Sequence, residues 1–489
     1  MGILDAPFRE SRVQRWARRF DGVGSRYPVM ASPPTVTMQG NASTINANTA
    51  GNVSHRFDND ALTHIGNAVI NDGTNRGVGS SITFADSSKQ ASNSPIRTRF
   101  VTDAPAFEAV FRGTQFAAVS AIVDGEYIAR ARLAVFPNDG NPHYVKFDFG
   151  TNTRTYTLAQ VSKNAGGSGY AVGDQITLAG GTFSTAAVVT VIQVSSGAIS
   201  AIEVSNQGAY SVSTTTFTQG STTGSGTGAT FNGPVWSAQF TQRKMRRIEL
   251  IWHGSGQKLY GINVDNQSTV LPYAVPALAP KIAFVGDSIT NGTYLDYAGA
   301  HIGLSIGQRL GLADRAEINA IGGSGWATVN TTVTPNGPAW NDAKRVADFI
   351  ALDADIYVWW GSQNDAAAGS SVVTAAVQSV LSQVSAAVPK AIHIGLGPIN
   401  VSGTPGTDLS TAVGAGFAAM GNASRFRYID STAENWLSGT GKVTGETTTG
   451  NKDFYLSSDN AHPDQAGLDY LAYQASVRIA DTICQMVGT

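Results

Sequence analysis

Residues 281–290 read KIAFVGDSIT, so that a short apolar run leads straight into Gly-Asp-Ser. The apolar residues Ile282 to Val285 predict a short buried strand. Gly286 lets the chain turn sharply at the end of that strand, where a residue with a Cβ would clash. We therefore expect Ser288 at the carboxyl edge of a sheet, which is the usual place for chemistry in open α/β folds.

A histidine and an acid lie together far downstream, in the segment Asp459-Asn460-Ala461-His462-Pro463. A serine hydroxyl is a weak nucleophile until a neighbouring base takes its proton. His462 is suited to that task, and Asp459 is suited to holding the imidazole in the correct tautomer. These residue types predict a serine esterase with Ser288 as the nucleophile, and they call for no metal and no cofactor.

Two further segments lie between these ends and offer hydrogen-bond donors. Residues 319–326 (NAIGGSGW) follow a possible strand, and the apolar run Ile356–Trp360 ends in Gly361-Ser362-Gln363-Asn364-Asp365. Attack on an ester carbonyl builds negative charge on its oxygen, and fixed donors aimed at that oxygen stabilise it. Suitable donors are a glycine N–H, an asparagine amide and the backbone N–H of Ser288.

Together, the four segments resemble the SGNH, or GDSL, hydrolases, from about Pro276 to the C-terminus. The resemblance implies that Ser288, His462 and Asp459 are catalytic, and that the oxyanion hole consists of Ser288, Gly325 and Asn364. Two residues separate Gly361 from Asn364, where the family usually has one. Gly325 fits the Ser-Gly-Trp form of some carbohydrate esterases, and Gly323 is the alternative.

Each segment also has an ordinary structural interpretation. Asp459 is a plausible helix cap, the glycines of 322–325 are typical of turns, and Asn364 suits a turn or a cap. The four segments nevertheless occur in the order of the family, and each of the first three follows an expected strand. This joint order favours the catalytic interpretation.

Composition narrows the class of protein. The chain has 489 residues, of which 14% are charged, and a net charge of −2, which gives no reason to expect nucleic acid or an anionic membrane as partner. Its single cysteine, Cys484, excludes an intrachain disulfide. Residues 1–20 lack the continuous apolar core of a secretory signal. We expect a cytoplasmic protein, or one that leaves the cell by another route such as assembly into a virion.

The N-terminal part, 1–60, is expected to hold an amphipathic helix and a linker. Apolar residues between the arginines of Phe8–Phe20 indicate the helix, and the Ser-, Asn- and Gly-rich stretch after it is typical of a linker. The helix either packs on its own domain or docks on a partner. We favour docking on a virion or tail partner.

Alternating strands in 61–160 and 234–275 predict a β-sandwich in two parts, and this layout resembles the jelly-roll modules that precede the hydrolase in some carbohydrate esterases. A Gly/Tyr-rich β insert, 161–233, divides the two parts and resembles small modules of bacteriophage tail proteins. Its tyrosines either stack on sugars or pack its own small core, and we favour the core. The last part, 276–489, alternates strands with helices, which predicts an α/β/α SGNH hydrolase domain with a parallel sheet.

These features together predict an enzyme that removes O-acetyl groups from a bacterial surface polysaccharide, as part of a phage tail spike or fibre at the host surface. Trp326 and Trp360, and Trp359 beside it, lie next to motif glycines and suggest a sugar subsite, although at least one of the pair 359–360 is expected in the core. A homo-oligomer is compatible with this function. The alternative is a receptor-binding or structural tail protein whose degenerate hydrolase domain only binds glycan.

Overall fold

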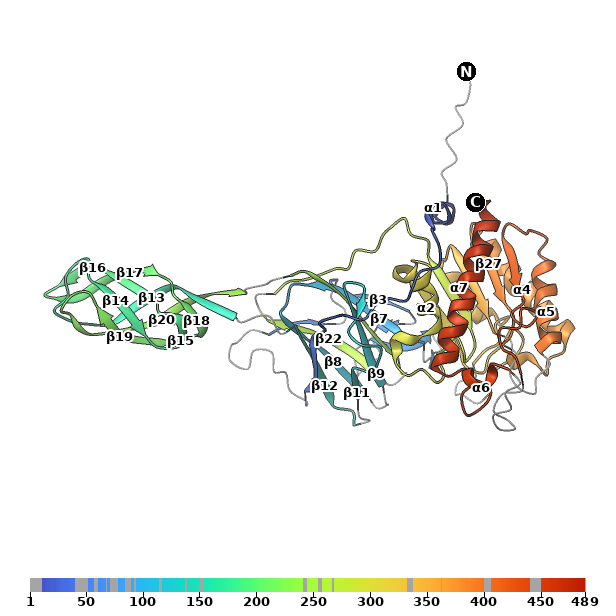
Figure 1. Ribbon diagram of the computed structural model, residues 1–489, viewed down its shortest axis with the longest axis horizontal. Coiled ribbons are helices and arrows are strands. Elements are labelled where there is room, and N and C mark those ends of the chain that lie inside the picture. Colours follow the sequence, from blue (N-terminus) through green and yellow to red (C-terminus); the bar gives the residue numbers. More distant parts are fainter. Residues whose placement is uncertain are drawn as a thin grey trace, which may run out of the picture.

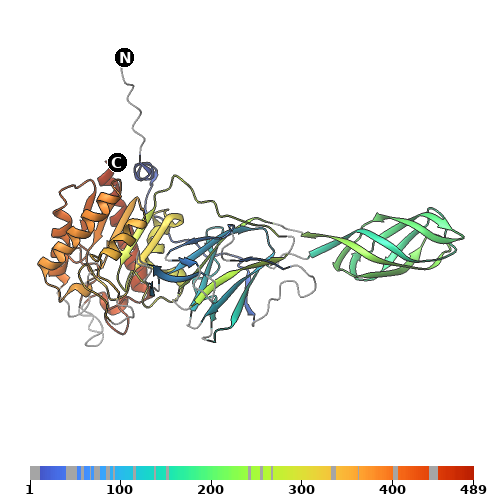
Figure 2. The same ribbon diagram turned by 180° about the vertical axis from the view of Figure 1, so that it is seen from behind.

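The protein forms three bodies in a row, with the C-terminal domain at one end, a β-sandwich in the middle and a β-rich insert at the other end (Figures 1 and 2). The structure is a computed structural model, and it describes residues 11–39, 52–56, 60–66, 68–70, 78–83, 89–91, 94–113, 117–136, 139–149, 154–240, 244–253, 257–265, 268–331, 337–361, 363–399, 406–439 and 450–488. In these described ranges, no helix is both long enough and apolar enough to cross a membrane.

The C-terminal domain is built on a five-stranded sheet in which every pairing is parallel. Its strands lie in the order β25 (Ala316–Ala320), β24 (Ile282–Gly286), β26 (Ile356–Trp360), β27 (Ile392–Leu396) and β28 (Phe426–Ile429). Strands β24, β26 and β27 are buried along their whole length, as expected for a parallel sheet covered on both faces. The predicted parallel sheet is therefore confirmed.

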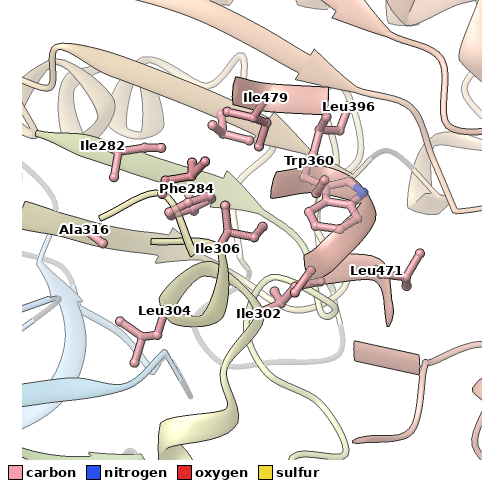
Figure 3. Packing of buried hydrophobic residues seen from close by; sticks show 14 of the residues in the cluster. Ile282, Phe284, Ile302, Leu304, Ile306, Ala316, Trp360, Leu396, Leu471 and Ile479 are labelled. Atoms are coloured by element: carbon pink, nitrogen blue, oxygen red, sulfur yellow. The ribbon is translucent and has the colours of Figure 1, made fainter. Parts of the chain in front are cut away.

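Helices cover both faces of this sheet. On one face, α2 (Ile302–Arg309) and α7 (Gln465–Val487) share a hydrophobic core with the sheet, to which they contribute Ile306 and Leu471 (Figure 3). On the other face lie α3 (Ala343–Ala351), α4 (Ser370–Ala387) and α5 (Gly406–Ala418). Four short helices complete the domain: η1 (Ala298–Ala300), η2 (Ala313–Arg315), η3 (Gln363–Asp365) and α6 (Lys452–Tyr455).

The middle body is a sandwich of two antiparallel sheets that enclose one hydrophobic core. One sheet holds β1 (Thr35–Gln39), β2 (Asn52–Arg56), β4 (Ala68–Ile70), β5 (Val78–Thr83), β6 (Lys89–Ala91), β8 (Ala106–Gly113), β12 (Pro142–Asp148) and β22 (Gln257–Asp265). The other holds β3 (Thr63–Ile65), β7 (Ile96–Thr102), β9 (Ala117–Val123), β10 (Glu126–Tyr127), β11 (Ala134–Phe136), β21 (Arg246–His253) and β23 (Val270–Leu271). Jelly-roll connectivity remains a prediction.

The insert is an eight-stranded antiparallel sheet that runs from Arg154 to Phe240. It therefore begins earlier and ends later in the chain than the predicted 161–233. It contains β13 (Arg154–Ser168), β14 (Gln175–Ala179), β15 (Thr182–Thr185), β16 (Val188–Ser195), β17 (Ala198–Asn206), β18 (Ala209–Val212), β19 (Thr216–Thr222) and β20 (Thr227–Phe240). Tyr170 and Tyr210 are buried in its own core, and each hydroxyl accepts a backbone N–H, from Ala229 and Ala187 respectively. The core interpretation of these two tyrosines is therefore correct.

Buried arginines connect the sandwich to the C-terminal domain. Arg97 and Arg99 on β7 are only 2% and 1% exposed, and both pair with Glu249 on β21. Arg97 also donates to the carbonyl of Ala313 at 2.6 Å, and Arg99 to that of Asp314 at 2.7 Å, in the C-terminal domain. These bonds satisfy the backbone of η2 with donors from the other domain.

The two domains also share a hydrophobic core. Ile122, Tyr127 and Ile251 of the sandwich belong to the same buried cluster as the residues that face α2 and α7. The Tyr127 hydroxyl donates to the carbonyl of Gly299 at 2.7 Å and accepts from Gln308 at 2.7 Å. The C-terminal domain therefore buries part of its apolar surface only with the sandwich in place.

The N-terminal helix α1 (Arg12–Arg19) packs on its own protein. A capping box between Ser11 and Gln14 starts it, Val13 and Ala17 are buried, and Val13 belongs to the core cluster that includes residues of α7. The helix lies beside the C-terminal part of α7 (Figure 1), and Trp16 donates its indole N–H to the carbonyl of Leu310 at 2.9 Å. The expectation that this apolar face docks on a partner is therefore wrong, because the C-terminal domain already covers it. Residues 1–10 lie outside the described residues.

Candidate active site

Ser288 lies in the turn that follows β24, at the carboxyl edge of the parallel sheet. A Cβ on Gly286 would overlap the side chain of Thr290 and the carbonyl oxygen of Trp360, so only glycine fits there. The Asp287 carboxylate accepts the N–H of Ile289 at 3.1 Å and thereby closes the turn. The turn places a half-buried Ser288 beyond the end of β24, next to Gly322 in the segment that follows β25.

Ser288, His462 and Asp459 form one chain of hydrogen bonds. The distance from His462 Nε2 to Ser288 Oγ is 2.8 Å, and that from His462 Nδ1 to Asp459 Oδ2 is 2.6 Å. His462 lies in the loop just before α7, so the fold joins residues that are 174 positions apart in the sequence. This is the nucleophile–base–acid arrangement of serine hydrolases.

The Asp459 carboxylate is held ionised by its donors. Burial alone would raise its pKa, but hydrogen bonds from Ser457 and His462, and the N–H of Ala461, outweigh that effect and lower the pKa well below its usual range. Ser457 Oγ donates at 2.7 Å and the N–H of Ala461 at 2.9 Å. Asp459 is thus fixed both in charge and in orientation toward the imidazole.

Gly322 is the glycine beside the nucleophile. A Cβ placed on it would lie 3.7 Å from the Cβ of Ser288 and 3.8 Å from its Cα. Among the described residues, the backbone N–H groups of Gly322 and Ser288 donate to no protein acceptor. These two N–H groups therefore remain available to a reacting oxygen.

Gly325, the predicted oxyanion glycine, is placed for a different task. Its N–H donates to the carbonyl of Thr328 at 3.0 Å, and a Cβ on it would lie 2.5 Å from the Asp365 carboxylate. Asp365 is buried, which raises its pKa, and it accepts the N–H of Trp326 at 2.8 Å. The structure therefore contradicts Gly325 as the donor. The alternative, Gly323, has φ +72° and faces Asn330.

Asn364 lies at the end of β26, in η3, and is half-buried. Its side-chain amide donates to the carbonyl of Ser324 at 2.9 Å, which ties it to the turn that contains Gly322. An amide group has two N–H donors, so this bond orients the group and leaves a second donor. The extra residue after Gly361 thus still leaves Asn364 joined to the turn beside Ser288.

Trp326 and Trp360, predicted as substrate contacts, are core residues. They are 1% and 3% exposed, and Trp359 is buried as well. Trp326 packs against Trp340 and Trp359 on one face of the sheet, and Trp360 packs on the other face (Figure 3). Neither indole is available to a sugar, so this prediction is wrong. Strand alternation had sent the two neighbours 359 and 360 to opposite faces.

Tyr294 is a site residue that sequence reasoning missed. Its ring centroid lies 5.7 Å from that of His462, and its side chain is 48% exposed. No pattern in 291–297 sets it apart from an ordinary loop residue, because the contact depends on where the loop meets residues 457–462. Gly322 was also missed, although its position two residues after strand β25 could have identified it as a candidate site residue.

Comparisons with known proteins agree with this architecture. No family profile and no curated protein matches the chain. Among solved structures, the salicylyl-acyltransferase SsfX3 from a tetracycline biosynthetic pathway is similar at 11% identity and a TM-score of 0.50, over 88% of this chain and 97% of that one. A family two carbohydrate esterase from Cellvibrio japonicus is similar at 12% identity and a TM-score of 0.46, over 92% and 99%.

An acetyl xylan esterase, Est2A, from Butyrivibrio proteoclasticus is similar at 11% identity and a TM-score of 0.45, over 89% of this chain and 99% of that one. Identities this low describe the fold and not the activity. The structural neighbours thus include carbohydrate esterases. The chain is a β-rich protein of several sheets, one of which is parallel.

Proposed function

We propose that this protein is a serine esterase that removes O-acetyl groups from a bacterial surface polysaccharide. The observation that carries the proposal is the hydrogen-bonded chain from Ser288 through His462 to Asp459. A serine so placed is activated for attack on a carbonyl carbon. In a glycan-binding module without activity, nothing would require these three groups to lie in line.

In the first step, Ser288 Oγ bonds to the acyl carbon while His462 Nε2 takes the hydroxyl proton. His462 then gives that proton to the sugar oxygen as the ester bond breaks, which leaves an acetylated Ser288. In the second step, water attacks this acyl group while His462 takes a proton from the water. His462 then gives this proton to Ser288 Oγ as acetate leaves. Asp459 keeps the imidazole oriented and stabilises its protonated form.

The oxyanion in both steps is stabilised, in this proposal, by the N–H groups of Ser288 and Gly322 and by the amide of Asn364. Gly322 replaces Gly325 in this role because its N–H is uncommitted and it lies against Ser288. Loss of one such donor typically costs about 10²–10³-fold in kcat. Asn364→Ala should show that loss, with little change in KM.

The substrate assignment has two supports. Several structural neighbours are carbohydrate esterases by name, among them an acetyl xylan esterase. The catalytic serine is half-buried at a sheet edge, which leaves it open to an ester on a large polymer. Acetate release from O-acetylated bacterial polysaccharides by the purified full chain tests this assignment, with Ser288→Ala as the inactive control.

A matched control is Ser379→Ala, on the exposed face of α4, which should release acetate at the wild-type rate. Acetate released equally by wild type and Ser288→Ala would contradict the esterase. Polysaccharide bound without any acetate release would favour the alternative, a receptor-binding tail protein whose hydrolase domain only binds glycan.

A second candidate function is acyl transfer to an acceptor other than water. It is favoured by the similarity to a salicylyl-acyltransferase at a TM-score of 0.50. The same acyl-serine would form, and an alcohol or amine would then take the place of water. Added acceptor alcohols distinguish the two functions: an esterase releases mostly free acetate, whereas a transferase yields the new ester in proportion to the acceptor.

We also propose that the protein acts on the outside of the host as part of a phage tail. The support is the Gly/Tyr-rich insert, which has only four charged residues between 154 and 240 (Arg154, Lys163, Asp174 and Glu203) and extends away from the catalytic domain (Figure 2). Since the apolar face of α1 is already buried, a tail partner would meet its arginine-rich outer face. Immunogold labelling of virions tests this placement, and unlabelled tails would contradict it.

A further inference from the structure

Tyr294 lies on the loop that links the turn of Ser288 to η1, and its ring lies beside that of His462. Its ring centroid is 5.7 Å from that of His462, with the two planes inclined by 43°. Nearly half of the tyrosine side chain is exposed, so burial of the ring does not explain why it takes this position.

The backbone at Tyr294 is strained. Its φ is +62°, a left-handed conformation that is uncommon for residues other than glycine and that strains a bulky residue. Such a conformation persists only where surrounding contacts impose it, and it is concentrated at functional sites. A glycine would adopt the same φ freely, so the tyrosine is retained at a conformational cost.

The phenol group of Tyr294 interacts with the acid of the catalytic chain. The charge of Asp459 is the largest cause of a raised pKa at Tyr294, followed by burial and by hydrogen bonding to the same carboxylate. Tyr294 thus packs its ring near that of His462, and its phenol group is subject to the charge of Asp459. Both interactions bear on the imidazole and on the acid that orients it.

The sandwich holds the loop in this place. Arg132, between β10 and β11, donates from Nε to the carbonyl of Asp296 at 2.5 Å and from a terminal nitrogen to that of Leu295 at 3.3 Å. At the other end of the loop, Ser94 Oγ donates to Asn291 Oδ1 at 3.2 Å. Contacts from the neighbouring domain therefore bracket Tyr294 on both sides.

We propose that Tyr294 is a positioning residue of the active site, held over His462 and Asp459 by Arg132 of the sandwich. It keeps the imidazole aimed at Ser288 and shields the His462–Asp459 hydrogen bond from water. The sandwich thereby becomes part of the catalytic apparatus. An effect of Tyr294 on catalysis rests on the proposed esterase function, whereas its effect on the orientation of His462 does not.

The kinetic test uses p-nitrophenyl acetate, whose small size separates positioning from binding of a polysaccharide. Tyr294→Gly should lower kcat about tenfold while KM stays near the wild-type value, because a misaligned base slows the chemistry and not the binding. Its thermal midpoint should equal or exceed that of the wild type, since glycine removes the strain. Tyr294→Phe, which keeps the ring and loses the hydroxyl, should fall between the two.

Arg132→Ala should lower kcat in the same direction as Tyr294→Gly. Its matched control is Arg112→Ala, which also loses one Nε–carbonyl bond, to Gly140 at 2.7 Å, but within the sandwich. The control should keep the wild-type kcat. An unchanged kcat in Arg132→Ala would overturn the role of the sandwich, and a raised KM with unchanged kcat in Tyr294→Gly would make Tyr294 a substrate platform instead.

A spectroscopic measurement separates this inference from the esterase assignment. In protein with ¹⁵N-labelled histidine, the Nδ1 proton that bridges His462 to Asp459 should give a downfield resonance, identified by its absence from His462→Gln. We expect Tyr294→Gly to broaden or remove it by faster exchange with water, and Arg112→Ala to leave it unchanged. A resonance equally sharp in Tyr294→Gly would overturn the inference even if the enzyme is active. Its loss would support the inference even if no ester is cleaved.

Discussion

At the residue scale, the fold brings an ordinary serine into line with a base and an acid. The sequence was sufficient to select Ser288, His462 and Asp459, which the structure joins by hydrogen bonds, because each residue type has a chemical role and lies in a recognisable local segment. It did not single out Gly322 or Tyr294. Three glycines within 322–325 look alike in sequence, and only the turn geometry brings Gly322 beside Ser288, where a Cβ built on it would lie 3.7 Å from the Ser288 Cβ.

Replacing Asp459 by asparagine should leave a weak enzyme. An amide keeps the size of the side chain but removes the charge that stabilises the protonated imidazole. Its N–H group also favours the other tautomer of His462. We expect kcat on p-nitrophenyl acetate to fall about 10³–10⁴-fold, less than for His462→Ala. Ser457→Ala, which removes one donor to Asp459, should cost far less. Wild-type turnover by Asp459→Asn would remove Asp459 from the mechanism.

The pH profile should show a single acid limb. Hydrogen bonds lower the pKa of Asp459. The carboxylate therefore stays ionised at pH values where an ordinary aspartate would already be protonated, and it loses its charge only far below about pH 4. A general base, by contrast, stops working once it has bound a proton, so activity falls on the acid side as His462 becomes protonated. Above about pH 4, the logarithm of kcat/KM should therefore fall with a slope of one proton. A slope of two there would mean that Asp459 titrates as well.

At the element scale, alternation along a strand explains both a success and a failure. The apolar runs at 282–285 and 356–360 correctly predicted buried strands, since both faces of the parallel sheet are covered. The same burial removes Trp360, on β26, from the surface, and Trp326 is covered by Trp340 and Trp359, so neither indole is exposed to a sugar. Aromatic residues next to a motif in the sequence can therefore lie in the core and not line the site.

The strand pair β7–β21 should be the most sensitive point of the domain interface. Arg97 and Arg99 outweigh the effect of burial and lower the pKa of Glu249, so its carboxylate stabilises the fold above about pH 4 and loses this effect as pH falls. Glu249→Gln leaves the buried Arg97 without its ion-pair partner and Arg99 with only Asp314, at a cost of about 3 kcal/mol. A lowered thermal midpoint at pH 7 checks this. Glu203→Gln, on the exposed surface of the insert, is the control, and equal midpoints for the two variants would contradict the account.

At the scale of the whole molecule, the C-terminal domain and the sandwich behave as one unit and the insert as another. Tyr127 and Ile251 of the sandwich lie in the core of the C-terminal domain, whereas the insert has its own core and extends away from both (Figure 1). Sequence patterns predicted the three bodies but not this division, because alternating strands do not reveal which outer faces will be buried against another domain.

Deleting residues 154–240 should therefore leave a folded and active enzyme. Arg154 pairs directly with Phe240 at the base of the insert, so the remaining ends lie close enough for a short Gly-Ser link. We expect an unchanged kcat on p-nitrophenyl acetate and, if the insert holds glycan, a raised KM on polysaccharide. Deleting residues 1–275 instead should destabilise the protein, because it exposes the shared core. The reverse pattern would contradict the division into two units.

The central claim is that Ser288 is an activated nucleophile, and covalent labelling tests it most directly. The full chain is incubated with a fluorophosphonate, and the modified peptide is located by mass spectrometry. We predict one adduct, on Ser288, that is absent from Ser288→Ala and forms at least about 10³-fold more slowly in His462→Ala. Labelling at another residue, or labelling of Ser288 at the same rate without His462, would contradict the account.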